Sequence, residues 1–366
     1  MVLNRYSAEI DYYCLFRQSL FLLKSDIAIP DTVLVSLRDA ATAHPDSNTY
    51  KTLSKATTDL LRKQVTALEP LYGKGTFHRI YRATLENNKA CIIRTSIEQI
   101  HHRSFDFYID DFAMGVLKSI NLPSLHIHTI DISRNECPYD LEIIEEAGGY
   151  SLNDNQLIHA DNDEIIRQLG ITMATYHGIQ TSHAGLLDIR SILNNEPTCT
   201  GLLKTWSEFI HLNLERHIAY CFNIGAIKSS DCTYIEKLFN DSTRILDQVK
   251  PSLLHGDLSN SNIFSDGKRI TAIIDWEDSI AGDPVFDIAS WGTFIGNDAR
   301  RDQLLHGYRS IRPLPPDFDF RYWLYYLRII LAKTVHRHRF KYDLSDRIPA
   351  AQRISASLSK IRRLYT

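Results

Sequence analysis

The stretch "LLHGDLSNSNIFSDGKRITAIIDWED", residues 253–278, places polar groups among segments suited to burial. The apolar runs "NIF" and "ITAII" flank Asp266-Gly267, and both of these residues tolerate the positive φ that a tight turn needs. The pattern therefore predicts a β-hairpin with Asp266 and Gly267 at its tip. In that register Asn262 faces Thr271 across the hairpin.

Three oxygen-bearing side chains meet at the open end of this predicted hairpin. Asp275 falls opposite Leu258, close to Asp257, and Asn262 lies on the first strand. Carboxylates at the edge of an apolar core repel each other and lose hydration unless a cation lies among them. Oxygen ligands suit Mg²⁺, which usually completes its shell with phosphate oxygens and water. This combination favours phosphoryl transfer as the reaction class.

The order of the three residues matches the roles that kinases need. In a kinase catalytic loop an Asp accepts the acceptor's proton, an Asn a few residues later binds metal, and an Asp after a buried strand bridges metal and phosphates. We therefore predict Asp257 as the catalytic residue, with Asn262 and Asp275 as metal ligands. For each of these residues alone, the alternative role is to cap a turn, but the spacing of all three together favours a catalytic site.

The motifs "HGDLSNSN", "IIDWED" and "GDPVFDIASW" give the chain a family resemblance. It resembles the aminoglycoside phosphotransferase and choline-kinase-like family, and looks closest to its hygromycin-kinase-like branch. The resemblance covers roughly residues 66–340. It implies an α+β, bilobal, protein-kinase-like fold with a small antiparallel-sheet N-lobe and a larger, mainly helical C-lobe. It also implies ATP, with GTP as the alternative, and Mg²⁺.

Hydrophobic periodicity divides the chain into three regions. Residues 1–65 read as a helical N-terminal extension, and residues 66–147 as an N-lobe with a three-stranded meander, one helix and two further strands. Helical spacing dominates residues 148–366, the expected C-lobe with the catalytic hairpin and the acceptor site. We expect the N-lobe helix to bury one face, which consists of Phe105, Tyr108, Phe112, Val116, Leu117 and Ile120.

The resemblance assigns nucleotide-binding roles in the N-lobe. Arg94 takes the place of the kinase lysine, and Asp110 is the acid expected to anchor it, with Asp106 and Asp111 as alternatives. A glycine-rich turn over the phosphates and a hinge for adenine complete the expected set: Gly73, Gly75, Thr76, Ile144, Glu145 and Glu146.

Further polar residues are expected to support the site. His255 supports the catalytic loop by hydrogen bonding, Asp287 braces that loop, and Asp283 caps a turn. The pairs His101-His102 and His336-x-His338 lack further ligands at suitable spacing, so surface histidines are favoured over a metal site.

Composition narrows the remaining function classes. The chain is 44% hydrophobic and 23% charged with a net charge of −3, as in soluble globular proteins. The scattered cysteines, with no Cys-x-x-Cys pair, fit reduced thiols in a cytoplasmic protein. A basic excess after residue 300 lacks a recognition motif, so nucleic-acid binding is disfavoured. No membrane association is expected, and the chain is expected to be a monomer or a weak homodimer.

The predicted activity is transfer of a γ-phosphate to a hydroxyl of an antibiotic-like, sugar, nucleoside or amino-alcohol compound. The family resemblance places the acceptor against residues of about 201–250 and 318–341. The late helix there carries basic residues that would repel a polycationic aminoglycoside. These are Arg321, Arg328, Lys333, Arg337 and Arg339. We therefore expect a neutral, weakly cationic or anionic acceptor, although nearby acids would favour the opposite: Glu208, Glu215, Glu277 and Asp278.

Two rival functions are considered beside this one. A protein kinase is disfavoured because no Asp-Phe-Gly or Ala-Pro-Glu segment follows Asp275. A catalytically inactive nucleotide-binding module that acts through partner binding is disfavoured because Asp257, Asn262 and Asp275 are all present.

Overall fold

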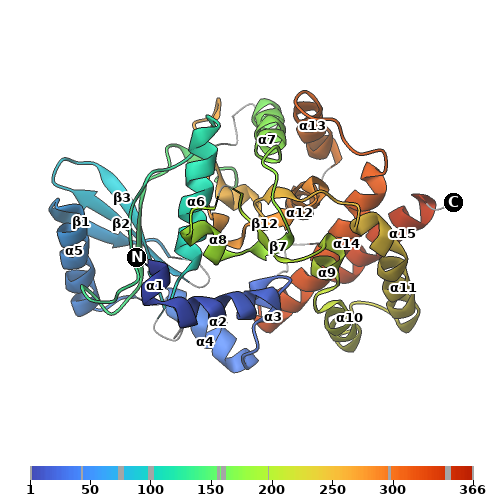
Figure 1. Cartoon of the computed structure of the whole chain (residues 1–366), viewed down its shortest axis with the longest axis horizontal. Helices are drawn as coiled ribbons and strands as arrows, with labels where there is room; N and C mark the ends of the chain where they lie inside the picture. Colours follow the sequence, from blue (N-terminus) through green and yellow to red (C-terminus); the bar gives the residue numbers. More distant parts are fainter. Residues whose placement is uncertain are drawn as a thin grey trace.

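The computed structural model describes residues 2–42, 44–72, 78–97, 103–154, 157, 162–196, 198–295, 298–342 and 348–364. A five-stranded antiparallel sheet lies at one end of the molecule, at the left of Figure 1. Its strand order is β1-β2-β3-β5-β4. The strands are β1 (Val65–Pro70), β2 (His78–Leu85), β3 (Ala90–Ser96), β4 (Ile127–Asp131) and β5 (Leu141–Glu145).

Alternation along β2 and β3 gives this sheet its own small core. Tyr81 and Ile93 are buried on the face that helix α5 (Ser47–Leu61) covers with Leu53 and Ala56. The three-stranded meander and the two further strands that the sequence predicts are all present.

Helix α6 (Asp106–Ser119) stands between this sheet and the rest of the molecule (Figure 1). Of the face expected from sequence, Phe105 and Leu117 are buried, whereas Tyr108, Phe112, Val116 and Ile120 are only partly buried. The fully buried positions are Phe107, Ile109, Asp110, Ala113, Met114 and Leu117. The expected face was therefore incomplete, because α6 packs against different neighbours along its length and its buried surface spreads around the helix.

Helices make up most of the chain beyond the sheet, and they surround one large core that includes Trp206, Trp276 and Trp291. They are α7 (Asn162–Tyr176), α8 (Ile189–Leu193), α9 (Trp206–His211), α10 (Leu214–Asn223), α11 (Ser229–Leu246), α12 (Pro284–Ile295), α13 (Asp298–Arg309), α14 (Phe318–Arg339) and α15 (Ala350–Leu364). Helices α7 and α13 pack closely because Gly170 and Gly307 face backbone of the opposite helix, where a Cβ atom would clash.

Two small antiparallel sheets lie within the helical part. One has the order β11-β10-β6 and the other the order β8-β7-β12-β9. Their strands are β6 (Tyr150–Ser151), β7 (Ala184–Leu187), β8 (Gly201–Leu203), β9 (Ser252–Leu254), β10 (Ile263–Ser265), β11 (Ile270–Ile273) and β12 (Ile280–Gly282). The sequence predicted only the β10–β11 hairpin, because the other strands are too short to show a periodic pattern.

The hairpin forms, but its predicted register is wrong. Ile263 pairs with Ile273, and the register shifts between Phe264 and Ser265. Asn262 therefore does not face Thr271, and it precedes the first paired residue of β10.

The register differs because the hairpin tip is longer than two residues. The Asp266 side chain accepts hydrogen bonds from the backbone N–H groups of Lys268 (3.0 Å) and Arg269 (2.9 Å). Gly267 takes a φ of 89° beside it. A local side-chain bond of this kind stabilises a wider turn and moves the pairing along both strands.

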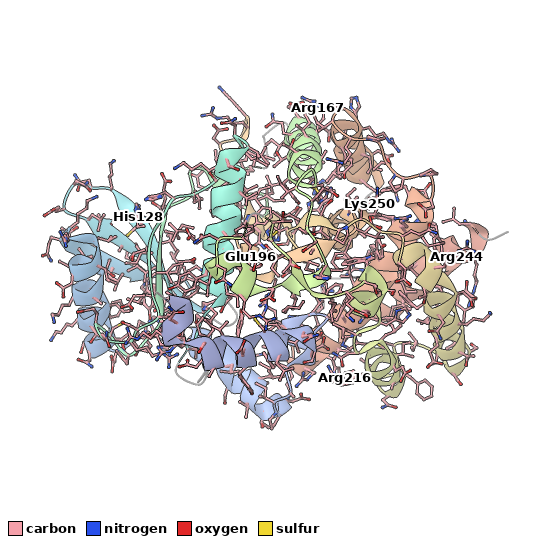
Figure 2. All side chains as sticks on the ribbon, in the orientation of Figure 1. His128, Arg167, Glu196, Arg216, Arg244 and Lys250 are labelled. Atoms are coloured by element: carbon pink, nitrogen blue, oxygen red, sulfur yellow. The ribbon has the colours of Figure 1, made fainter. Side chains whose placement is uncertain are left out.

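Among the described residues, four helices precede α5, and the third of them, α3, packs on the helical part. They are α1 (Val2–Arg5), α2 (Ser7–Gln18), α3 (Leu23–Asp26) and α4 (Asp31–Thr42). Asp26 accepts from His217 (2.6 Å) and forms an ion pair with Arg216, which lies at the lower edge of Figure 2. Arg339 of α14 donates to the carbonyl oxygens of Ser25 and Ile27.

The architecture is the expected α+β class, with a small antiparallel-sheet lobe and a larger, mainly helical lobe. Among the described residues, none of the helices is both long and apolar enough to cross a membrane.

Candidate active site

The loop after β9 is held in place by one buried carboxylate. Asp287, at the start of α12, accepts hydrogen bonds from the backbone N–H groups of His255 (2.7 Å) and Gly256 (2.9 Å). Tyr176 and His177 also bond its Oδ2 atom. Gly256 has a φ of 86°, and a Cβ atom there would clash with a backbone carbonyl. Asp287 thus fixes the backbone immediately before Asp257.

The His255 ring joins this loop to the strand that leads to Asp275. Its Nε2–H group donates to the carbonyl oxygen of Ile274 (2.9 Å), and the ring packs on Trp276. This geometry suits the supporting role expected for His255.

Asp283 caps the start of α12. Its Oδ1 atom accepts from the backbone N–H of Val285 (3.0 Å). Its Oδ2 atom accepts from the hydroxyl of Tyr325 (2.7 Å) and from Arg321 (3.0 Å). The positive charge of Arg321 is therefore paired with Asp283 and is not left to a ligand alone.

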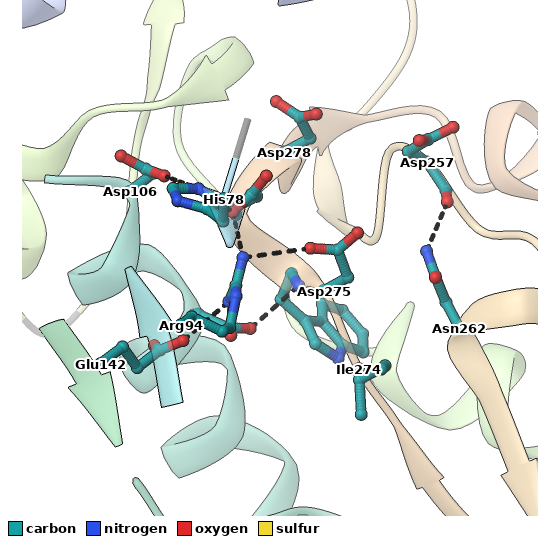
Figure 3. Close-up of polar contacts among 12 residues, drawn as sticks. His78, Arg94, Asp106, Glu142, Asp257, Asn262, Ile274, Asp275 and Asp278 are labelled. Carbon is teal, nitrogen blue, oxygen red and sulfur yellow. Dashed lines mark hydrogen bonds and ion pairs between the residues drawn. The ribbon is translucent and has the colours of Figure 1, made fainter. Parts of the chain in front are cut away.

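Asn262 and Asp257 are linked through the backbone. The Asn262 Nδ2 group donates to the carbonyl oxygen of Asp257 (3.2 Å), and the Ile274 N–H donates to the carbonyl oxygen of Asn262 (2.9 Å). Within the described part of the chain, the Oδ1 oxygen of Asn262 has no hydrogen bond. Asp275 follows at a φ of 70°, a left-handed conformation that Asp tolerates. Figure 3 shows Asp275 between Arg94 and the Asp257–Asn262 pair.

Arg94 on β3 connects the sheet to this hairpin. Its Nη1 group contacts Asp110 (2.8 Å) and Glu142 (2.8 Å), and its Nη2 group contacts Asp275 (3.3 Å) and Glu277. Arg94 and Asp110 thus form the expected ion pair. Figure 3 shows the Arg94 guanidinium between Glu142 and Asp275.

Asp110 joins two parts of the site at once. Its Oδ2 atom holds Arg94, and its Oδ1 atom accepts from the backbone N–H of Trp276 (2.9 Å), the residue after Asp275. Burial raises the pKa of Asp110 to about 6, and Arg94 opposes that shift. The alternative anchor Asp106 contacts His78 instead.

The catalytic candidate Asp257 lies between two ammonium groups. Lys333 is 3.5 Å from its Oδ1 atom and Lys24 is 3.8 Å from its Oδ2 atom. Burial favours the neutral acid, but Lys333 and then Lys24 outweigh it and lower the pKa of Asp257 well below its ordinary value. Asp257 is therefore ionised at neutral pH.

His78, Asp106 and Glu277 form a cluster with the spacing of metal ligands. The His78 Nε2 atom lies 3.2 Å from Asp106 and 3.1 Å from Glu277. Burial alone would lower the pKa of His78, but Glu277 outweighs it and the pKa rises to about 10. The protonated imidazole thus bridges the two carboxylates beside Arg94.

The expected hinge follows β5. Ile144 is buried within the sheet, and the backbone N–H of Glu145 donates to the carbonyl oxygen of His126 (2.9 Å). Glu146 pairs with Arg82 at 2.6 Å. The expected phosphate turn, Gly73, Gly75 and Thr76, lies outside the described residues, as do His101 and His102.

Several basic residues of α14 have structural partners and do not line an acceptor site. Arg328 is fully buried and donates to the carbonyl oxygens of Ile210 and Leu212. Arg339 holds the segment after α3. The repulsion argued from these charges therefore has a weaker basis than the sequence indicated.

Sequence reasoning missed Lys24, Glu142 and His78, and it considered Glu277 and Lys333 only as charges near the acceptor. Lys24, His78, Glu142 and Lys333 lie far along the chain from the hairpin, on elements whose periodicity indicates burial alone, whereas Glu277 directly follows the hairpin. No local motif marks them; the tertiary fold brings them to the site.

A family model, described as the phosphotransferase enzyme family, matches residues 112–323. The chain belongs to this family. The resemblance inferred from the hairpin motifs is thereby confirmed.

Individual relatives of this phosphotransferase-family chain are distant. A curated relative, hygromycin-B 4-O-kinase of Escherichia coli, is 25% identical over 99 residues, which span 26% of this chain and 28% of that protein. The matched segment thus covers less than a third of that relative.

Solved structures share the fold over most of the chain. Aminoglycoside phosphotransferase APH(4)-Ia aligns with a TM-score of 0.61 and 19% identity, over 85% of this chain and 99% of that one. A putative fructosamine-3-kinase from Thermobifida fusca gives 0.59 and 17%, over 84% and 98%. Choline kinase LicA from Streptococcus pneumoniae gives 0.55 and 16%, over 87% and 100%. These proteins share the kinase-like architecture.

Proposed function

We propose that this chain transfers the γ-phosphate of ATP to a hydroxyl group of a small molecule and needs Mg²⁺ to do so. The supporting observation is the convergence of Asp257, Asn262 and Asp275 at the open end of the hairpin, where Arg94 meets Asp275. Solved relatives of the same fold support the nucleotide, because APH(4)-Ia structures are ternary complexes with ADP or AMP-PNP and hygromycin B.

The residues present fit a divalent cation. Asn262 offers an oxygen without a hydrogen bond from the described residues. Burial, and then the charge of Glu277, raise the pKa of Asp275, so a cation would relieve an unfavourable charge. Asn262 and Asp275 would hold Mg²⁺, which supplies charge neutralisation at the β- and γ-phosphate oxygens when bound.

Asp257 would orient the acceptor. Since its pKa is low, the ionised carboxylate accepts a hydrogen bond from the acceptor hydroxyl but attracts the proton weakly. A weak base suits a loose phosphoryl-transfer transition state, in which the proton leaves late and positioning dominates. The brace from Asp287 holds Asp257 in place for this role.

The sheet would bind the nucleotide, within an N-lobe of residues 66–147. Arg94 would contact phosphate oxygens with the Nη2 group that now meets Asp275. The turn at Gly73, Gly75 and Thr76 would cover the phosphates, and the hinge at Ile144, Glu145 and Glu146 would receive adenine. Because the N–H of Glu145 already bonds His126, other hinge backbone groups must contact the base.

The test is an acceptor screen with Mg²⁺ and ATP, followed by phosphate-transfer mass spectrometry. We expect a phosphorylated product, and we expect Asp257→Ala to slow its formation about 10²- to 10⁴-fold while the protein stays folded by circular dichroism. Asp302→Asn, a change at an exposed acid on α13, serves as the matched control and retains activity. Nucleotide binding without turnover of ATP in any condition would contradict the proposal and favour an inactive module.

A further inference from the structure

Two ammonium groups approach the candidate catalytic carboxylate, one at each oxygen. Lys24 comes from α3 and Lys333 from α14, elements far apart in the sequence. Their distances to Asp257, 3.8 Å and 3.5 Å, exceed the length of about 2.7–2.9 Å that a charge-assisted hydrogen bond prefers. Neither lysine therefore makes a charge-assisted hydrogen bond of ordinary length with Asp257. For Lys24, burial lowers the pKa, but the carboxylates of Asp257, Asp278, Asp275 and Glu277 outweigh it and raise the pKa.

The position of Lys24 is fixed by the fold. Asp26, two residues later, accepts from the backbone N–H groups of Phe21 (2.8 Å) and Leu22 (3.1 Å) and from the buried ring of His217. Arg339 bonds the carbonyl oxygens on the other side of this short helix. These hydrogen bonds fix the backbone from which Lys24 extends, and its side chain is 23% exposed.

Lys333 is a buried ammonium group with poor compensation. Its side chain is 7% exposed, and its neutral contacts are the Thr293 hydroxyl (3.3 Å) and the ring of Phe294 (3.7 Å to the centroid). Burial lowers its pKa to about 7 even though Asp257 opposes the shift. Burying a cation costs free energy unless an anion accompanies it, so a second anion beside Lys333 would stabilise its charged form.

A third polar atom lies nearby without a partner. His336, one turn after Lys333 on α14, has a buried Nδ1 atom that makes no hydrogen bond within the described residues. Burial lowers the pKa of His336 to about 3, and the Lys24 ammonium acts in the same direction. The ring is therefore neutral, and both Lys24 and Lys333 act on it electrostatically.

Lys24 and Lys333 approach Asp257 from the helices, and Lys24 is also within electrostatic reach of Asp275, Glu277 and Asp278. The proposed phosphate contacts come from the sheet, through Arg94, and from the metal ligands Asn262 and Asp275. Lys24 and Lys333 belong instead to helices that pack on the helical part. Because Asp257 receives the acceptor hydroxyl in the proposed reaction, groups that flank its oxygens contact the atoms next to that hydroxyl.

We propose that Lys24 and Lys333 form an anion-binding subsite, and that the acceptor carries a carboxylate or a phosphate ester close to the hydroxyl that is phosphorylated. This inference rests on the proposed function and specifies its substrate class. With ordinary hydrogen-bond lengths at both ends, the anion lies at most roughly 9 Å from the reacting oxygen. Hydroxy acids and phosphorylated polyols or sugars have this geometry. A polycationic aminoglycoside would bring like charges against both lysines.

The test uses the full chain with Mg²⁺, ATP and matched acceptors. Glycerol, glycerate and glycerol 3-phosphate form one set, glucose, gluconate and glucose 6-phosphate form another, and hygromycin B is the polycationic reference. We expect kcat/KM to be at least tenfold higher for an anionic acceptor than for its neutral counterpart. The carboxylate and phosphate members of each set show which anion the subsite accepts.

Lysine variants assign that preference to the subsite. Lys24→Met and Lys333→Met should reduce the ratio of anionic to neutral kcat/KM at least fivefold, through KM, and Lys24→Arg should restore much of it. Lys268→Met, at the exposed hairpin tip, should leave the ratio unchanged. An equal fall for anionic and neutral acceptors would overturn the inference, since the lysines would then act on Asp257 or on the transferred phosphoryl group. So would a preference for neutral or cationic acceptors.

A binding measurement covers the case in which none of these acceptors is used. Inorganic phosphate is titrated calorimetrically into the complex with Mg²⁺ and AMP-PNP. Saturable binding that weakens at least fivefold in Lys24→Met or Lys333→Met supports the subsite, and its absence in the wild type refutes it. Failure of the proposed function looks different: the wild type would consume no ATP, even with water as acceptor, and both proposals would then fall. ATP consumption without any anion preference overturns the subsite alone.

Discussion

Replacing Asp287 with asparagine should uncouple the catalytic loop from α12. In the wild type, the Oδ1 atom accepts from the Gly256 N–H, and the Oδ2 atom accepts from the His255 N–H, from Tyr176 and from His177. Asparagine can place its oxygen at only one of these positions. Its NH₂ group then faces at least one donor, and the negative charge that strengthens the remaining bonds is lost.

The size of this effect follows from the number of donors and the complete burial of the carboxylate. Asp287 has 0% exposure. Breaking a buried charged network by removing one partner costs about 3–5 kcal/mol, and a buried donor left unpaired accounts for about 1–3 kcal/mol of that. We therefore expect Asp287→Asn to lower the free energy of unfolding by about 3–5 kcal/mol. Because Asp257 follows directly, a shift of about 1 Å in the loop should also lower kcat on the order of 100-fold.

Urea denaturation followed by tryptophan fluorescence measures the free energy of unfolding, and initial rates with a phosphorylatable acceptor measure kcat. Asp302→Asn removes an exposed acid from α13 and should change the unfolding free energy by less than about 0.5 kcal/mol. If Asp287→Asn lost less than about 1 kcal/mol, the inferred role of the brace would be refuted.

Three further outcomes are expected. Arg94→Met leaves the fully buried Glu142 unpaired and should lower the free energy of unfolding in urea by about 3–5 kcal/mol. Adding Glu142→Gln should restore part of this loss, and equal stability of the single and double variants would count against the prediction. The pKa of His78 is about 10, raised from 6.5, so its stabilisation is complete below about pH 6.5 and is lost as the pH rises through 10. The difference in melting temperature between wild type and His78→Gln should narrow from pH 6 to pH 10, and a constant difference would exclude this origin. Asp275→Asn should raise the Mg²⁺ concentration for half-maximal turnover at least about tenfold, whereas an unchanged Mg²⁺ titration would argue against Asp275 as a ligand.

Local sequence was sufficient for the hairpin and the sheet because their signals lie within a few residues. The runs of apolar residues on either side of Asp266-Gly267 marked the two strands of the hairpin. The spacing of Asp257 and Asn262 marked the loop that precedes the first strand. The register was beyond reach, since it depends on whether the Asp266 side chain bonds the backbone at Lys268 and Arg269. Short strands such as β6 and β12 left no pattern at all.

The electrostatic part of the site could be predicted only in outline. The pairing of Arg94 with Asp110 followed from the family resemblance, but nothing local indicates that Glu142 and Glu277 share the same guanidinium. Lys24 illustrates the limit best. It lies in a short helix with no motif, and only the contacts of Asp26 and Arg339 with neighbouring elements bring it to Asp257.

If the chain binds ATP as proposed, Asp110 has a mechanical consequence for nucleotide exchange. One of its oxygens is fastened to Arg94 on the sheet and the other to the backbone beside Asp275, so a single side chain spans the seam between the two lobes. When phosphates draw Arg94 away from Asp275, this fastening can persist. In the proposed reaction, opening of the lobes to release ADP would then pivot about α6, and its rate would be sensitive to changes on that helix.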